Sequence, residues 1–138
     1  MWHAGDWGDI ALSDQIEKLA PVRGVYGNID GHIVRSVYPK ELFFECEGLK
    51  VFITHIGGYP GRYQKDVLAR LKELQPDLFI CGHSHILKVM RDKKLNLLHF
   101  NPGAIGNKGM NKKRTLLRFE VDQGKISELK VLEYDKNF

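Results

Sequence analysis

The chain has 138 residues, of which 43% are hydrophobic, and a formal net charge of +4. This length and composition suit one compact domain with a substantial core, which we expect to extend over residues 1–138. A helical membrane protein is excluded, because no apolar run approaches the ~20 residues that a spanning helix needs. Nucleic-acid binding is not favoured either, because the most basic segment, residues 108–114, contains no aromatic side chain for base stacking.

The N-terminal part alternates strand-like and helix-like patterns. We expect a first strand that ends at Asp6 and then a short helix over residues 14–19, with Ser13 as its N-cap and Pro21 beyond its end. A second strand over residues 22–26 should follow.

A β-hairpin and a longer helix are predicted next. Residues 41–45 and 49–54 are β-rich runs separated by Glu47-Gly48, a pattern typical of a hairpin. From about Tyr63 onwards, apolar residues recur at helical spacing on one face, which we expect to pack into the core. This face comprises Val67, Leu68, Leu71 and Leu74.

The C-terminal part is predicted to be almost entirely β-structure. The apolar run 78–80 indicates a buried strand, and hairpins should follow it. The expected strands cover residues 87–91, 95–100, 115–121 and 126–134, with a turn at 122–125. Alternating strands and helices followed by hairpins predict an α/β fold, with two packed sheets and helices outside them.

Four strand ends in this pattern carry side chains that can bind a metal, with glycine nearby. The four segments are His3-Ala4-Gly5-Asp6, Gly27-Asn28-Ile29-Asp30, Thr54-His55 and Gly82-His83-Ser84-His85. Each side chain alone has an ordinary alternative as a turn former or helix cap. Because α/β sheets gather ligands at the carboxyl ends of their strands, four such ends in succession favour one shared metal site.

The remaining cysteines and histidines are interpreted as structural. Cys46 and Cys81 lie in apolar runs, which is typical of reduced core residues in a cytoplasmic protein. His3 and His99 lie within strands, and we expect them to pack rather than to bind a metal. His32 is expected to be an exposed loop residue, with proton donation to a leaving group as the alternative.

The order of the four segments resembles the motifs of the calcineurin-like metallophosphoesterases. Residues 101–104, Asn-Pro-Gly-Ala, resemble the small bacterial and archaeal phosphodiesterase branch of that family. The resemblance implies a two-sheet α/β sandwich and a dinuclear centre of divalent ions, with manganese favoured and zinc, nickel or iron as alternatives. The implied metal ligands are Asp6, Asn28, His55, His83 and His85.

The resemblance also implies a role for each ligand. Asp6 would bridge the two ions, and Asn28, His55 and His83 would complete the shell of one of them. His85 would bind the other ion. Asp6 and Asn28 are the implied catalytic residues, Asp30 would support the Asn28 loop, and no organic cofactor is expected.

The sequence departs from the family pattern at its start. The family opens with a strand that ends in Asp-x-His and supplies two ligands of one ion, whereas this sequence begins at Met1-Trp2. We therefore expect the first strand and its crossover helix, about 30 residues, to be missing. This predicts at most one bound ion, weak turnover, and self-association into a homo-oligomer through an unpaired strand edge.

The expected function is metal-dependent hydrolysis of a small or nucleotide-like phosphodiester. Ile29 lies where many phosphomonoesterases of the superfamily have a proton-donating histidine, which favours diesters as substrates. The alternative is a catalytically weak scaffold that binds proteins, as a retromer subunit of the same family does. The five ligands that are present favour the enzyme, and the absent Asp-x-His segment favours the scaffold.

Overall fold

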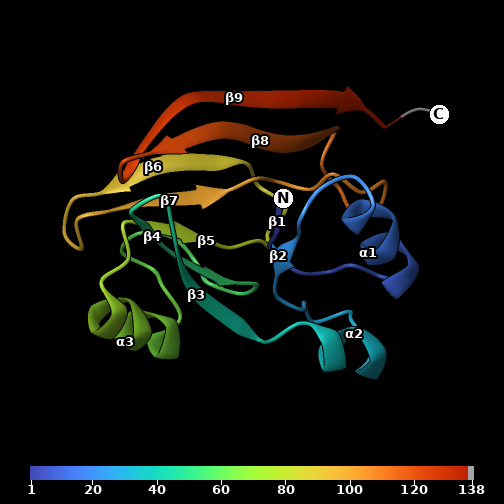
Figure 1. Cartoon of the computed structure of the whole chain (residues 1–138), viewed down its shortest axis with the longest axis horizontal. Helices are drawn as coiled ribbons and strands as arrows, with labels where there is room; N and C mark the ends of the chain where they lie inside the picture. Colours follow the sequence, from blue (N-terminus) through green and yellow to red (C-terminus); the bar gives the residue numbers. More distant parts are fainter. Residues whose placement is uncertain (137–138) are drawn as a thin grey trace.

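A five-stranded mixed sheet forms the centre of the molecule in this computed structural model, which describes residues 1–136 (Figure 1). Its strand order is β3-β4-β5-β7-β6. Strands β4, β5 and β7 are parallel, whereas β3 and β6 run antiparallel to their neighbours. The carboxyl ends of three central strands therefore meet at one edge. The strands are β3 (Glu41–Cys46), β4 (Leu49–Thr54), β5 (Leu78–Ile80), β6 (Lys88–Asp92) and β7 (Leu97–Asn101).

Two hairpins confirm the turns that the sequence predicts. Glu47 and Gly48, which join β3 to β4, both have positive φ, at 48° and 79°. Gln123 and Gly124 have φ values of 49° and 74° and join β8 (Lys113–Asp122) to β9 (Lys125–Asp135). Positive φ at both central residues is the geometry that suits the twist of a two-residue hairpin. The two turns touch, because the amide of Gly124 donates to the carbonyl of Glu47 at 2.6 Å.

The second layer of the fold is divided into two small sheets on one face of the central sheet. The β8–β9 hairpin forms one of them, and the parallel pair β1 (Trp2–His3) and β2 (Arg23–Gly24) forms the other. Trp2 joins this layer to the core, with its ring 5.1 Å from that of Phe44 and 5.6 Å from that of Phe119. The predicted α/β arrangement of packed sheets is confirmed, although β2 is shorter than the expected strand.

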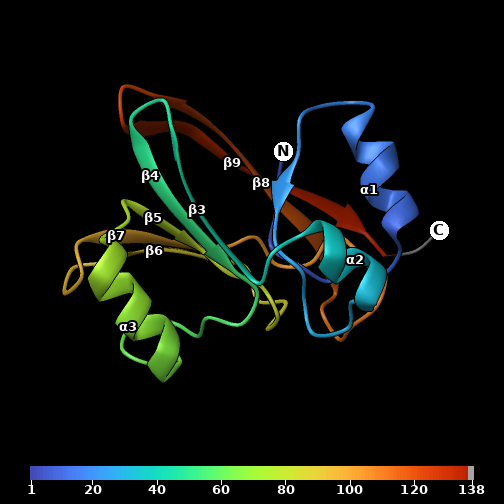
Figure 2. The same cartoon turned by 60° about the horizontal axis from the view of Figure 1, so that its bottom comes forward.

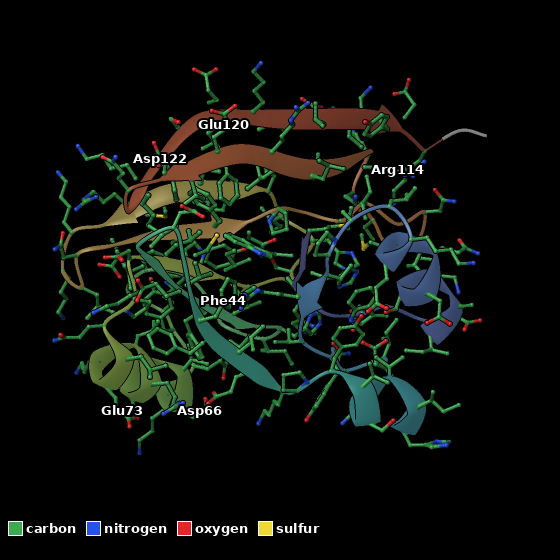
Figure 3. The ribbon with its side chains drawn as sticks, in the orientation of Figure 1. Phe44, Asp66, Glu73, Arg114, Glu120 and Asp122 are labelled. Atoms are coloured by element: carbon green, nitrogen blue, oxygen red, sulfur yellow. The ribbon has the colours of Figure 1, made fainter. Side chains whose placement is uncertain are left out.

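Helix α3 (Lys65–Leu74) covers the opposite face of the central sheet. Its buried residues Val67 and Leu71 pack in the cluster that includes Phe52 and Phe79, as the helical spacing predicts. The acidic residues Asp66 and Glu73 are exposed on its outer side (Figure 3).

Two short helices beside β1 and β2 differ from the sequence prediction (Figure 2). Helix α1 (Ile10–Glu17) starts earlier than expected, because Asp9 caps it by accepting a hydrogen bond from the amide of Ala11 at 2.9 Å. The predicted cap, Ser13, is instead buried inside the helix and hydrogen-bonded to the hydroxyl of Tyr38.

The second of these helices was not predicted. Helix α2 (His32–Val37) is only six residues long, too short to show a helical period in the sequence. His32 is its first residue and is exposed as predicted, but it lies in a helix rather than in a loop. No helix within residues 1–136 is long and apolar enough to cross a membrane.

Candidate metal centre

The turn after β1 places the carboxylate of Asp6 at the edge of the molecule where the central strands end. Gly5 and Asp6 have φ values of 98° and 64°, so the chain passes through the left-handed region twice in succession. This conformation is uncommon for a residue with a side chain. It is held by Asp30, which accepts hydrogen bonds from the amides of Asp6, Trp7 and Gly8 at 2.9–3.1 Å.

Asp30 also joins this turn to the loop that carries Asn28. It accepts a further hydrogen bond from the amide of Gly27 at 2.8 Å, and the residue is only 3% exposed. Burial alone would raise the pKa of the Asp30 carboxyl, but the four amide hydrogen bonds outweigh burial and hold the pKa below its usual value. Asp30 therefore occupies the supporting position that the sequence predicts for it.

Two glycines let the ligand loops approach one another closely. A Cβ atom on Gly27 would overlap Oδ1 of Asp6, and a Cβ atom on Gly5 would lie 2.6 Å from Nδ1 of His55. A side chain at either position would displace a predicted ligand. Close approach explains why glycine stands beside these ligands in the sequence.

Four of the five predicted ligands lie together. His55, at the end of β4, places Nε2 2.9 Å from Oδ1 of Asn28 and 3.2 Å from Oδ2 of Asp6. His83, after β5, places Nδ1 3.0 Å from the same oxygen of Asn28, and the two imidazole rings are 5.3 Å apart. Three strand ends and one loop thus bring two imidazoles, one amide oxygen and one carboxylate to a single point.

The hydrogen bonding of His55 tests whether these side chains fit a cation. Nδ1 of His55 lies 2.7 Å from the carbonyl oxygen of Ala4, which can only accept, so Nδ1 carries the proton. In the neutral ring, Nε2 then presents a lone pair to Asn28 Oδ1 and Asp6 Oδ2. A cation placed between these three electron-rich atoms would satisfy all of them at once. Two atoms that each lie ~2.1 Å from one ion are roughly 3 Å apart, as these atoms are.

The amide of Asn28 is central to this set. Within residues 1–136, no three side chains of His, Cys, Asp and Glu alone form a group able to hold a metal ion. Asn28 Oδ1 is the atom that both His55 and His83 contact, and His55 in turn contacts Asp6. Mixed nitrogen and oxygen donors of this kind suit borderline divalent ions such as manganese, iron, nickel or zinc.

The fifth predicted ligand, His85, differs from the other four in its contacts. Within residues 1–136, no hydrogen bond or ring contact joins it to Asp6, Asn28, His55 or His83. Its neighbour is Gly109, where a Cβ atom would lie 2.6 Å from Nδ1 of His85. The structure thus brings together the four side chains predicted for one ion and places the fifth beside the 104–112 loop.

Asn101 supports the loop that carries His83 and His85, and the sequence did not indicate this. Asn101 is 1% exposed, and its amide donates to the carbonyl of Gly82 at 3.0 Å and to the hydroxyl of Ser84 at 3.1 Å. The hydroxyl of Ser84 also meets that of Tyr59. His83 and His85 have φ values of 67° and 60°, so Asn101 fixes a backbone that is unusual at both histidines.

The other candidate groups are structural, as predicted. The ring of His3 stacks on Trp7 at 3.7 Å, and burial lowers its pKa to about 4. His99 is fully buried, and burial likewise lowers its pKa to about 4. Cys81 is 1% exposed, and burial raises the pKa of its thiol to about 12, so it is neither a nucleophile nor a ready metal ligand at neutral pH.

Known proteins provide an independent comparison. Residues 1–124 match the family model described as the calcineurin-like phosphoesterase superfamily domain. A curated protein of Methanothermobacter thermautotrophicus, named a probable metallophosphoesterase, is 33% identical over 102 residues, which cover 74% of this chain. The match spans 58% of that protein's own length.

Solved structures agree with this fold. A Streptococcus pneumoniae protein described as a predicted phosphoesterase is 25% identical with a TM-score of 0.68, over 98% of this chain and 72% of that chain. Vps29 of Entamoeba histolytica, solved in complex with zinc, has a TM-score of 0.73 at 18% identity, over 99% of this chain and 81% of that chain. At 18% identity, the second likeness shows the fold alone.

Proposed function

The chain belongs to the calcineurin-like phosphoesterase superfamily, and we propose that it is a metal-dependent phosphodiesterase that acts on a small phosphodiester. The observation that supports this most directly is the position of His55 Nε2, whose lone pair faces the oxygens of Asp6 and Asn28. A divalent ion satisfies these atoms without protonating the ring. Asp6, Asn28, His55 and His83 would hold that ion, with manganese as the favoured metal.

The proposed reaction is hydrolysis of one P–O ester bond. The oxygen of water adds to phosphorus, the bond to the leaving alcohol breaks, and the proton of water ends on the departing alkoxide. The chemistry supplied by a bound divalent ion is positive charge beside the phosphate and acidification of water. The products are a phosphomonoester and an alcohol.

The residues of the chain define which esters this site suits. Asp6 and Asn28 present oxygens at the centre, and the amide of Ile29 donates to Oδ1 of Asp6 at 3.2 Å, which orients that carboxylate. Ile29 has no proton to give a leaving group, although it is 64% exposed beside the centre. A diester with a good leaving group depends least on such a proton, so we propose diesters over monoesters.

A protein-interaction scaffold is the second candidate. The likeness to Vps29 favours it, since several of the similar solved structures are Vps29 proteins, and one of them is complexed with a cyclic peptide. Self-association and a cytoplasmic location remain proposals as well.

Metal analysis and turnover of the purified chain separate these candidates. We expect about one manganese ion per chain by elemental analysis, and slow manganese-dependent release of p-nitrophenolate from bis-p-nitrophenyl phosphate. Asp6→Ala and His55→Ala should lose both the ion and the turnover. His32→Ala, an exposed histidine outside the centre, should retain both. A chain that binds manganese but hydrolyses no diester would favour the scaffold, and a chain that binds no divalent ion would exclude the proposed centre.

A further inference from the structure

Residues 81–87 form the loop between β5 and β6, the histidine loop, and the hydroxyl of Ser84 in this loop has three hydrogen-bond neighbours. The side-chain amide of Asn101 donates to it at 3.1 Å, and the backbone amide of Ile86 donates to it at 3.3 Å. The third neighbour is the hydroxyl of Tyr59, in the loop after β4. Tyr59 thus contacts a serine that has a proposed metal ligand on either side of it in the chain.

The orientation of the Asn101 amide is fixed by its other contacts. Its Oδ1 accepts a hydrogen bond from the backbone amide of Gly103 at 3.0 Å, and its Nδ2 donates to the carbonyl of Gly82 at 3.0 Å. A backbone N–H only donates and a carbonyl only accepts, so exchanging Oδ1 and Nδ2 would break both contacts. The Asn101 atom that faces the hydroxyl of Ser84 is therefore the donor Nδ2.

These contacts determine the direction of the hydrogen bond between Ser84 and Tyr59. A hydroxyl group has two lone pairs that accept hydrogen bonds and one proton to donate. Asn101 and Ile86 occupy both lone pairs of Ser84, so Ser84 donates its proton to Oη of Tyr59. The proton of the Tyr59 hydroxyl is not used in this contact. Within residues 1–136, no other hydrogen bond joins this hydroxyl to the protein, so its proton has no protein acceptor.

Tyr59 lies at the edge of the central sheet where the proposed ligands gather. Its loop begins at His55 and runs beside the histidine loop, since the amide of Gly82 donates to the carbonyl of His55 at 2.9 Å. Further along, the thiol of Cys81 lies 3.6 Å from the carbonyl oxygen of Gly58. The side chain of Tyr59 is half-buried, and its contact with the histidine loop is at the surface. A ligand at this edge can therefore reach the hydroxyl.

We propose that Tyr59 binds the substrate by donating its hydroxyl proton in a hydrogen bond to a charged oxygen of the phosphodiester at the candidate centre. This proposal rests on the proposed function, to which it adds a catalytic residue. The proton stays on Tyr59, and the phosphate oxygen takes the place of water as its acceptor. Hydrogen bonds to ionised acceptors are stronger than those between neutral groups, and a donor that is fixed before the substrate binds needs no reorganisation.

Tyr63 is a second tyrosine in the same region whose hydroxyl proton is used within the protein. Its hydroxyl donates to Oδ2 of Asp92 at 3.0 Å. Tyr59 and Tyr63 are both half-buried, and their rings lie 5.5 and 5.9 Å from that of His99. The two tyrosines share these surroundings but differ in whether the hydroxyl proton has a protein acceptor. Tyr63→Phe is therefore the matched control for Tyr59→Phe.

Calorimetric titration of the manganese-loaded chain with dimethyl phosphate tests the proposal without turnover, because this diester has poor leaving groups. Tyr59→Phe should lower the affinity about tenfold, as expected for loss of a hydrogen bond to a charged group, and Tyr63→Phe should leave it unchanged. Ser84→Ala retains the tyrosine hydroxyl, so it should lower the affinity less than Tyr59→Phe does. Equal losses in Ser84→Ala and Tyr59→Phe would overturn the proposal, since Tyr59 would then act only as an anchor for the histidine loop.

The hydroxyl of Tyr59 can also be observed directly, by NMR of the chain with carbon-13 at Cζ of its tyrosines and zinc as a diamagnetic ion. Dimethyl phosphate should shift the Cζ signal of Tyr59 and leave that of Tyr63 in place. This measurement uses the unmodified chain, so it holds even if a variant fails to fold. A Tyr59 signal that stays in place at saturating dimethyl phosphate would overturn the proposal.

Kinetics separate failure of this proposal from failure of the proposed function. With bis-p-nitrophenyl phosphate and manganese, Tyr59→Phe should lower kcat/KM at least about tenfold, whereas Tyr63→Phe should not change it. Equal kcat/KM values in Tyr59→Phe and the unmodified chain would overturn the role of Tyr59 and leave the phosphodiesterase intact. A chain that binds dimethyl phosphate through Tyr59 but hydrolyses no diester would support the hydrogen bond and refute the phosphodiesterase.

Discussion

Non-glycine residues with positive φ occur at both ends of the central sheet. Those at the amino end are Glu47, Gln75, Asn96 and Gln123, and those at the opposite edge are Asp6, His83 and His85. The first four are exposed residues of turns and of a helix end. Their backbone conformation is explained by the reversal of the chain alone. The other three carry proposed ligands, and buried polar side chains hold them in place, namely Asp30 for Asp6 and Asn101 for the histidine loop.

The difference shows how one backbone conformation serves two purposes. In a surface turn, the left-handed region costs about 1–2 kcal/mol and brings strands together. At the candidate centre, the same conformation directs a functional side chain, and it persists because buried hydrogen bonds fix the surrounding loops. Substitutions should therefore act differently at the two ends of the sheet.

The largest effect is expected at Gly27. In Gly27→Ala the added methyl group overlaps the Asp6 carboxylate, so the variant should lose manganese binding and be destabilised by roughly 1–3 kcal/mol. Gly31→Ala is the matched control, because a Cβ atom there meets nothing within 4 Å. Calorimetric titration with manganese and thermal unfolding would measure both effects. Wild-type manganese affinity in Gly27→Ala would contradict the described approach of the two loops.

Asp30→Asn should have the next largest effect, and one that depends on pH. Four amides donate to this buried carboxylate, and loss of its charge should destabilise the chain by about 2–3 kcal/mol at pH 7. Because the folded-state pKa of Asp30 is lowered, its contribution to stability is present above its unfolded pKa of about 3.9 and is lost as the pH falls through the folded value.

Urea unfolding at several pH values would test this. The deficit of Asp30→Asn relative to the unmodified chain should be largest at neutral pH and should shrink below pH ~4. Asp66→Asn, at an exposed carboxylate on α3, should show a small deficit at neutral pH (Figure 3). A deficit for Asp30→Asn that grows as the pH falls would contradict the assigned direction of the pKa shift.

Asn101→Ala should weaken the centre without removing a ligand. It deletes the hydrogen bonds to Gly82 and Ser84, so manganese affinity should fall by about 10- to 100-fold, with a loss of stability of about 1–3 kcal/mol. Asn107→Ala, in the exposed loop that follows, provides the control. Loss of stability without a change in manganese affinity would show that Asn101 supports only the fold.

The sequence predicted features that depend on contacts between nearby residues better than those that depend on contacts between residues far apart in the chain. The two hairpins, the β5 strand and the apolar face of α3 follow from local patterns, and the structure confirms them. The start of helix α1 was misplaced although its cap is local, since Asp9 accepts from the amide of Ala11. Ser13, the cap that the sequence suggested, is instead bonded to Tyr38, 25 residues away. Contacts of that kind leave no signal in a single sequence.

The same limit applies to the candidate centre. Four ligand types at successive strand ends predicted side chains that do lie together, because the carboxyl ends of parallel strands share an edge. The approach of His85 to Gly109 depends on the 104–112 loop, and the support of the histidine loop depends on the buried amide of Asn101. Only the Asn-Pro-Gly sequence after a strand pointed to that region.

The smallest predicted change in stability contrasts the two ends of the sheet directly. Gln75 ends α3 with a φ of 48°, a position at which glycine is favoured, so Gln75→Gly should raise the free energy of unfolding by up to ~1 kcal/mol. Its manganese affinity should not change. His83→Gly relieves the same backbone strain and should raise the stability of the metal-free chain similarly, but it removes a proposed ligand and should abolish manganese binding. Urea unfolding with and without manganese would measure both variants. If Gln75→Gly were destabilised, the left-handed conformation at the amino end would not be strained, and the contrast between the two ends would be lost.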